Sequence, residues 1–373
     1  MKRIGLIDAD LLDHGTRHPN LALMKISGYL KENDNDVKLI EDYREVDEEQ
    51  YDLFYMSKVF NYTKVREDIL EMPNLIIGGT GFYEDGGEDL PYEIEHHMPD
   101  YRLYDSYVEK QIEEGKKNAS YYNDYKDKSI GFATRGCFRK CEFCINKKYD
   151  RAKFHSHISE WFDPSCKSIY LWDDNIFAYE GWRDVFKELA ETGKPFQFRQ
   201  GLDLRLLTEE KAEGLNKCRY KGDFIFAFDH IEDKELIEEK LKLWRKHTKK
   251  GTKLYVLCGY DSIDEKDIEN TFERIRIIMK YRCLPYIMRF QEYKKSKYRP
   301  IYVNLARWCN QPQFYKKKSF RQFCEANQFY HKNKSSLCLA YSSMLEFEKE
   351  FPEIAKKYFD LRFDEFTYNF GGK

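Results

Sequence analysis

Three cysteines lie within eight residues of this chain, and they are the residues best suited to chemistry. Cys137, Cys141 and Cys144 fall in the segment Ala-Thr-Arg-Gly-Cys-Phe-Arg-Lys-Cys-Glu-Phe-Cys, residues 133–144. Three thiolates at this spacing can surround one compact metal centre. A closed zinc site takes four ligands, and an ordinary four-iron cluster takes four cysteines. Three ligands would therefore leave one iron open to a substrate or cofactor.

Other possible ligands lie farther along the chain. The nearest are His155, His157 and Cys166. Histidines two residues apart in a loop are usually solvated polar residues, so we do not interpret the pair as a metal site. A further group, spaced by 15 and 14 residues, could hold an auxiliary cluster: Cys309, Cys324 and Cys338. This spacing matches no tight ligand loop, and cysteine is often simply buried. For the clustered cysteines, a zinc knuckle or buried thiols are the alternatives.

Short apolar runs alternate with helical stretches around the cysteine segment. Examples of these helical stretches between the apolar runs are 209–216 and 237–245. Six strands are predicted, at 130–133, 168–172, 196–199, 224–228, 254–257 and 286–288. This alternation is typical of βα units and a parallel sheet. A complete eight-unit barrel needs more chain, so we predict a partial six-unit barrel over 129–293, with the cysteine loop after its first strand.

The N-terminal segment shows the same alternation on a smaller scale. Strands are predicted at 3–8, 37–40, 53–56 and 75–77, and a helix at 21–30 with Asn20 as its N-cap. These elements predict an α/β fold with a small doubly wound, Rossmann-like domain over 1–100. Residues 84–128 lack apolar periodicity, and we interpret 101–128 as a linker.

The cysteine spacing, Cys-x3-Cys-x-aromatic-Cys, resembles the signature of the radical S-adenosylmethionine (radical SAM) enzymes. The matching residues are Cys137, Cys141, Phe143 and Cys144. The resemblance implies a partial six-unit barrel and a [4Fe-4S] cluster on the three cysteines. It implies that S-adenosylmethionine binds the open iron and is cleaved to a 5′-deoxyadenosyl radical, with Phe143 against the adenine. A one-electron donor, flavodoxin or ferredoxin, is the implied partner.

The whole chain also resembles uncharacterised radical SAM proteins of phage and Firmicute genomes. The shared text is at 20–25, 55–58 and 78–81. The N-terminal domain resembles the cobalamin-binding-type domain that precedes this barrel in one subgroup. The His-bearing version carries Asp-x-His-x-x-Gly, whereas this chain has Asp13-His14-Gly15. Cobalamin binding is therefore doubtful.

Polar residues at the ends of the next two predicted strands are candidates for cofactor binding. Asp173 and Asp174 follow the second strand, where the family usually has Gly-Gly-Glu. Either carboxylate could accept a hydrogen bond from the methionyl ammonium. The alternative is a helix N-cap, a role that Asp174 or Asn175 would suit.

The residues after the third strand are Gln200, Asp203 and Arg205, which suggest ribose and carboxylate recognition. An Asp–Arg surface pair is the alternative, and such pairs contribute little stability. Asp229-His230 and Tyr260-Asp261 occupy equivalent positions after later strands and are weaker candidates for substrate contact.

The predicted C-terminal extension, 294–373, has a mixed or helical pattern and begins with a basic region. Residues 294–334 contain eleven Lys or Arg and one acid, whereas 41–100 contain seventeen Asp or Glu and four Lys or Arg. Nine aromatic residues lie among these cations: Tyr298, Tyr302, Trp308, Phe314, Tyr315, Phe320, Phe323, Phe329 and Tyr330. Cations and rings together suit single-stranded nucleic acid. The favoured alternative is a helical cap with its aromatics in the core and its lysines solvated.

Composition excludes several classes of protein. With 42% apolar residues the chain can build a core, and a net charge of -2 excludes a uniformly basic nucleic-acid coat. No apolar run reaches the length of a membrane span, and the N-terminus turns acidic too early for a signal peptide, so we expect a cytoplasmic protein. The main hypothesis is a radical SAM enzyme acting on a nucleic acid, nucleotide, peptide or small metabolite. The alternative is a non-catalytic nucleic-acid-binding protein with a structural metal site.

Overall fold

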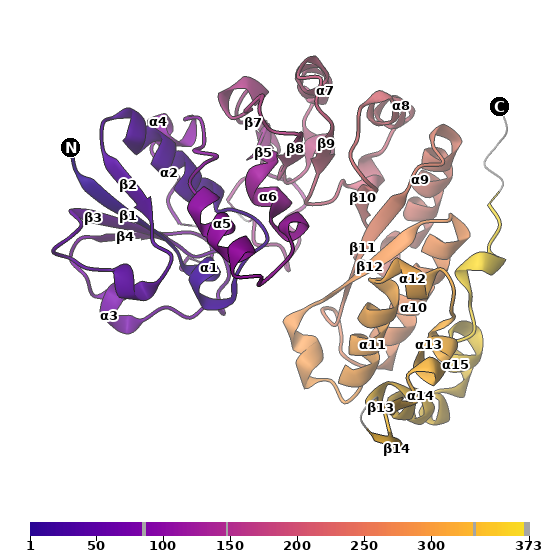
Figure 1. The fold of residues 1–373 in the computed structure, drawn as a ribbon. Coiled ribbons are helices and arrows are strands. Elements are labelled where there is room, and N and C mark those ends of the chain that lie inside the picture. The colour runs from indigo at the N-terminus through magenta and orange to yellow at the C-terminus, as the bar shows by residue number, and fades with distance from the viewer. Residues whose placement is uncertain (84–86, 147, 331–332, 369–373) are drawn as a thin grey trace. The chain divides into compact units, whose positions relative to one another are not determined.

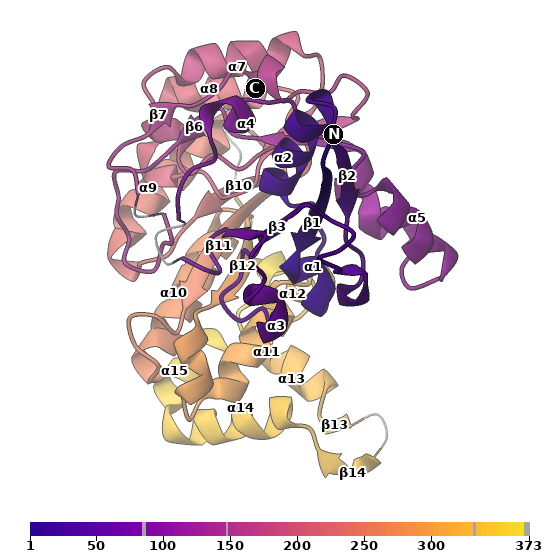
Figure 2. The same ribbon diagram turned by 90° about the vertical axis from the view of Figure 1, so that its left-hand side faces the viewer.

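The chain folds into two compact units, Met1–Gln200 and Gly201–Lys373. The computed structural model describes residues 1–83, 87–146, 148–330 and 333–368, and Figures 1 and 2 show its elements. Among these residues, no helix is both long enough and apolar enough to cross a membrane. The division after Gln200 differs from the predicted boundaries, because it falls within the segment predicted as one barrel.

A four-stranded parallel sheet begins the first unit. Its strands are β1 (Arg3–Asp8), β2 (Asp36–Leu39), β3 (Leu53–Ser57) and β4 (Leu75–Gly78). Their order, β2-β1-β3-β4, is that of a small doubly wound sheet, as the sequence predicts. The helices between them are α1 (Ala9–His14), α2 (Leu21–Glu32) and α3 (Glu67–Leu70). Asn20 caps α2 as predicted, since its side chain accepts from the Leu23 amide at 3.2 Å.

Alternate residues of these strands pack on opposite faces of the sheet. Ile4 and Leu6 of β1 join a core with α2, whereas Ile7 joins Phe54 and Met56 of β3 in a second core. This is the period-two burial of a strand covered on both sides. The central strands of the sheet are therefore covered on both faces.

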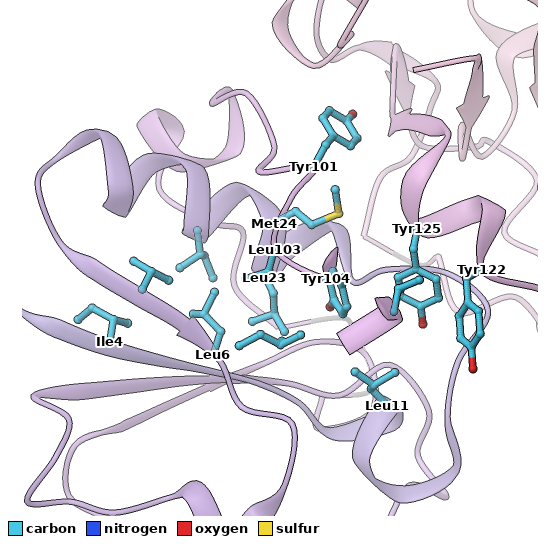
Figure 3. Packing of buried hydrophobic residues seen from close by; sticks show 14 of the residues in the cluster. Ile4, Leu6, Leu11, Leu23, Met24, Tyr101, Leu103, Tyr104, Tyr122 and Tyr125 are labelled. Carbon is cyan, nitrogen blue, oxygen red and sulfur yellow. The ribbon is translucent and has the colours of Figure 1, made fainter. Parts of the chain in front are cut away.

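The segment predicted as a linker is instead part of the first unit's core. It contains the short helices α5 (Asp105–Glu113) and α6 (Asn123–Lys126), and α4 (Tyr92–Glu95) precedes it. Figure 3 shows Tyr101, Leu103, Tyr104, Tyr122 and Tyr125 packing with side chains of β1 and α2. The segment lacks apolar periodicity because tyrosines supply much of its buried surface. A buried tyrosine is stable when its hydroxyl finds a partner, as the Tyr101 hydroxyl does at the Trp161 carbonyl, 2.6 Å away.

The six strands predicted for the barrel all form, as two parallel three-stranded sheets. The first unit contains a sheet of β5 (Lys128–Gly131), β8 (Ser168–Leu171) and β9 (Phe196–Phe198), in that order. Helix α7 (Trp182–Glu191) lies between β8 and β9 in the sequence. The second unit contains β10 (Phe224–Ala227), β11 (Thr252–Cys258) and β12 (Leu284–Arg289), with α8 (Glu209–Lys217), α9 (Lys234–His247) and α10 (Glu265–Lys280). Closure of the six strands into one partial barrel stays a prediction.

The C-terminal extension is largely helical and includes one two-stranded sheet, where the sequence predicts a mixed or helical pattern. Its elements are α11 (Arg299–Cys309), α12 (Pro312–Tyr315), α13 (Phe320–Ala326), β13 (Phe329–Tyr330), β14 (Asn333–Leu337), α14 (Leu339–Glu350) and α15 (Pro352–Tyr358). Figure 2 shows α11, α13, α14 and α15 close together. Six aromatics of the basic region are buried in this extension: Tyr298, Tyr302, Trp308, Tyr315, Phe320 and Phe323. These rings therefore serve the core. Phe314 is half-buried and Phe329 is exposed, whereas Lys332 and the side chains of Tyr330 and Lys334 lie outside the described residues.

Candidate metal centre

The three clustered cysteines lie on a loop that is closed at its base by a small hairpin. Strand β6 (Thr134–Arg135) follows β5 and pairs antiparallel with β7 (Lys153–Phe154). We call residues 136–152 the cysteine loop. It begins at Gly136, whose φ of +98° lies in the region that favours glycine. A Cβ at this position would overlap the carbonyl oxygen of Arg151, so the start of the loop passes against its end.

All three cysteine side chains are half-buried. The Cys144 amide donates to the Cys141 carbonyl at 3.0 Å, which makes a turn between the last two cysteines. The Arg139 amide donates to Cys137 Sγ at 3.5 Å. The Lys140 ammonium and the Asp150 carboxylate, 2.8 Å apart, connect the two arms of the loop. The thiols are thus confined by the loop and still reachable from outside.

Two aspartates after β8 hold the first residues of the cysteine segment. Asp173 Oδ1 accepts from the Thr134 amide at 2.6 Å and from its hydroxyl at 2.7 Å, and Asp173 Oδ2 accepts from the Ala133 amide at 3.3 Å. Asp174 Oδ2 accepts from the Gly136 amide at 2.6 Å. Burial raises the pKa of Asp173, which is 3% exposed, to about 6, and the hydrogen bonds from Thr134 and Ala133 oppose this rise.

The next residue, Asn175, reaches the first cysteine itself. Its side-chain Nδ2 donates to Cys137 Sγ at 3.3 Å. Asn175 occupies the N-cap position of a 3-10 helix, Ile176–Ala178, but its side chain makes no capping hydrogen bond there. The sequence suggests Asn175 only as a possible cap. The signal that points to a larger role is its place just after β8, the strand that pairs with β5.

These contacts bear on the predicted role of the two aspartates. Both oxygens of Asp173 are engaged by the cysteine segment, which favours positioning over cofactor contact for this residue. Asp174 is less buried than Asp173, and the Gly136 amide engages its Oδ2. The binding of the methionyl ammonium by either carboxylate stays a prediction.

The hydrogen bonds just described do not involve the remaining predicted residues. Phe143 is half-buried in the cysteine loop, and Gln200 is exposed after β9. Asp203 and Arg205 belong to the second unit, where Arg205 Nε donates to Asp203 Oδ1 and Arg205 Nη1 donates to Asp233 Oδ2, each at 2.8 Å. Burial would lower the pKa of Arg205, but Asp203 and Asp233 raise it above its usual value. Asp203 and Arg205 thus form an ion pair, as in the Asp–Arg alternative of the sequence analysis, but this pair is partly buried. Cofactor binding by these residues stays a prediction.

The other possible metal ligands described here are paired with carboxylates or buried. His155 Nε2 lies 3.1 Å from Glu95 Oε1, and His157 Nδ1 lies 2.8 Å from Glu188 Oε1. Burial raises the pKa of the thiols of Cys309 and Cys324. Within the described ranges, no three His, Cys, Asp or Glu side chains gather as a group that could hold a single metal ion. In a four-iron cluster each cysteine binds a different iron, so the fit of the loop to a cluster rests on its donor set and its spacing.

Comparison with known proteins places this geometry in a known fold. No model of a protein family matches the sequence, and no curated protein is found to be similar to it. Among solved structures, the radical SAM methyltransferase TsrM of Kitasatospora setae, with tryptophan substrate and a SAM analogue bound, matches with a TM-score of 0.50 and 12% identity over 77% of this chain and 73% of that chain. TsrM with cobalamin and a [4Fe-4S] cluster bound matches with a TM-score of 0.51 and 13% identity over 77% and 75%.

This chain has a fold similar to that of TsrM. At 12–13% identity, the likeness to TsrM is one of fold. It confirms the α/β fold that the sequence predicts. In this fold, β5 and β8 are the neighbouring strands that bring the cysteine loop against Asp173, Asp174 and Asn175.

Proposed function

We propose that this protein is a radical SAM enzyme in which Cys137, Cys141 and Cys144 bind a [4Fe-4S] cluster. One observation carries the proposal: a loop with three half-buried cysteines follows the first strand of the sheet β5-β8-β9, in a chain with the fold of TsrM. Three cysteines satisfy three irons and leave the fourth open to S-adenosylmethionine. Hydrogen-bond donors on Cys137 Sγ fit this use, since such donors are among the factors that tune protein-bound clusters.

The chain's own residues take the following parts in this proposal. A bound cluster supplies the electron that cleaves S-adenosylmethionine to a 5′-deoxyadenosyl radical, which abstracts hydrogen from the substrate. Phe143 presents its ring to the adenine, and Asp174 accepts from the methionyl ammonium. Asp173 holds the start of the cysteine segment. Because the electron must come from outside the chain, an external donor such as flavodoxin or ferredoxin is part of the proposal.

Cobalamin is left out of the proposal, although TsrM binds it. His14 is the histidine nearest to the pattern of the His-bearing subgroup, and both its ring nitrogens have partners. Nδ1 lies 3.0 Å from the Gly15 carbonyl oxygen, and Nε2 lies 3.1 Å from Thr63 Oγ1. Asp10, beside it, accepts from Val59 and Thr63. Binding of cobalamin through His14 would require these contacts to break.

The alternative function, a nucleic-acid-binding protein with a structural metal, has weaker support. It relies on the aromatic side chains of the basic C-terminal region to stack on bases, and six of these rings are buried. Base stacking needs an exposed ring face. We therefore do not propose nucleic-acid binding as the main function.

The test is the cleavage of S-adenosylmethionine by the reconstituted protein. The full chain is purified without oxygen, loaded with iron and sulfide, and given dithionite and S-adenosylmethionine, and 5′-deoxyadenosine is measured by chromatography. We expect product from the wild type and none from Cys144→Ala. The matched control is Cys218→Ala, which removes another half-buried thiol, at the end of α8. It should keep the activity, because this thiol lies outside the cysteine loop.

Two results would contradict the proposal. One is zinc in place of iron in the purified protein, with no cluster after reconstitution. The other is equal 5′-deoxyadenosine from the wild type and from Cys144→Ala, since product would then be independent of the three-cysteine site.

A further inference from the structure

Three consecutive residues after β8 bind successive positions of the cysteine segment. Asp173 accepts from Ala133 and Thr134, and the adjacent Asp174 accepts from Gly136. Asn175 donates to Cys137 Sγ. The two aspartates fix the backbone, whereas Asn175 is the member that touches a sulfur atom. The position of Asn175 relative to Cys137 is thus set by the residues that precede each of them, because Asp173 and Asp174 bind Thr134 and Gly136.

The direction of the hydrogen bond follows from the chemistry of the sulfur. Cysteine binds iron as a thiolate, which only accepts hydrogen bonds. The NH2 group of Asn175 must therefore face Cys137 Sγ, as it does at 3.3 Å. Asn175 is 4% exposed, so water has little access to replace its amide as the donor.

We propose that Asn175 is a positioning residue that raises the reduction potential of the cluster bound at Cys137, Cys141 and Cys144. This inference rests on the proposed function. Reduction adds one negative charge to the cluster. The positive end of the N–H dipole on a ligand sulfur stabilises the more negative state, and hydrogen bonds to the sulfurs are among the factors that set such potentials. The Arg139 amide acts in the same direction, but it belongs to the backbone, so Asn175 is the donor that a substitution can remove.

The test compares cluster reduction in variants of the full chain. Asn175→Leu keeps the size of the side chain and removes the donor. After reconstitution, the wild type and the variant are poised at one potential with redox mediators, and the reduced cluster is counted by electron paramagnetic resonance. We expect the ratio of reduced to oxidised cluster to fall about tenfold in the variant, a shift of about 59 mV for one electron. Asn304→Leu, the same change at a buried asparagine of α11, should leave the ratio unchanged.

Asn175→Asp provides a second variant if Asn175→Leu fails to load a cluster. It has nearly the shape of asparagine, but its carboxylate lacks N–H donors and adds a negative charge, so its ratio should fall at least as far. A wild-type ratio in either loaded variant would overturn the inference. Absence of a cluster from the wild type itself would refute the proposed function instead, so the two failures are distinguishable.

Discussion

At the scale of single residues, Asp8 is a buried carboxyl group whose ionisation opposes folding. It lies at the end of β1, is 2% exposed, and accepts from the Tyr104 hydroxyl at 2.8 Å and from the Leu11 amide at 3.1 Å. Burial raises its pKa to about 6, and these two hydrogen bonds oppose the rise. The folded protein therefore holds the Asp8 proton more tightly than the unfolded chain does. Stability falls as the pH rises from about 4 to about 6, and the loss is complete above this range.

We expect Asp8→Asn to gain stability relative to the wild type as the pH rises. The asparagine does not ionise, so the variant escapes the loss that the wild type suffers. A shift of about two pKa units corresponds to about 3 kcal/mol. The check is the difference in unfolding temperature between the two proteins from pH 4 to pH 8, with Asp34→Asn, an exposed aspartate of the same domain, as control. A constant difference between Asp8→Asn and the wild type across this range would contradict the expectation.

At the scale of elements, the cysteine loop depends on a close approach between its two ends. Gly136 has a φ of +98°, and a Cβ there would overlap the Arg151 carbonyl oxygen. An alanine would face both the cost of a left-handed conformation, about 1–2 kcal/mol, and this overlap. The loop would have to move away from Asp174, which accepts from the Gly136 amide.

Gly136→Ala should therefore bind a cluster at least about tenfold more weakly, since each 1.4 kcal/mol is a factor of ten in affinity. Iron and sulfide retained after gel filtration of the reconstituted protein measure this loss. Gly193→Ala is the matched control, because Gly193 also has a positive φ, +66°, while an added Cβ there meets nothing within 4 Å. Equal iron retention in both variants would show that the approach to Arg151 does not matter.

At the scale of the whole molecule, part of the basic charge of residues 294–334 is paired with acidic residues from later in the chain. In the C-terminal extension, Arg321 lies 2.7 Å from Glu348 and 2.9 Å from Asp360, and Lys297 lies 2.6 Å from Glu350. These cations of the basic stretch thus have acidic partners on later parts of the same extension. Together with the burial of the aromatic rings, these pairs explain how a basic, aromatic sequence serves the core of the extension.

We expect no saturable binding of single-stranded RNA by the full chain at about 0.15 M salt. Most rings of the basic region are buried and cannot stack on bases, and surface phosphate contacts alone weaken steeply with salt. Filter binding with bulk RNA between about 0.05 and 0.2 M salt checks this, with a known single-strand-binding protein as the positive control. Tight binding that persists at the higher salt would favour a nucleic-acid substrate.

The sequence by itself determined most of the strands and the spacing of the cysteines. The strands from β1 to β12 that build the parallel sheets lie where apolar runs predict them, and the cap of α2 lies at Asn20. These are local features, encoded within a few residues. The cysteine spacing is also local, so the radical SAM resemblance follows from the sequence alone. The prediction of a linker at 101–128 is wrong because the burial of this tyrosine-rich segment depends on what packs against it.

Only the tertiary structure decided how the cysteine loop is held. Asn175 and Cys137 are 38 residues apart in the chain and meet because β5 and β8 pair in parallel and end at the same edge of their sheet. The sequence offered Asp173 and Asp174 as cofactor ligands or helix caps, and the structure places their oxygens on the amides that lead into the loop. Hydrogen bonds between distant residues depend on strand pairing, which composition and spacing leave open.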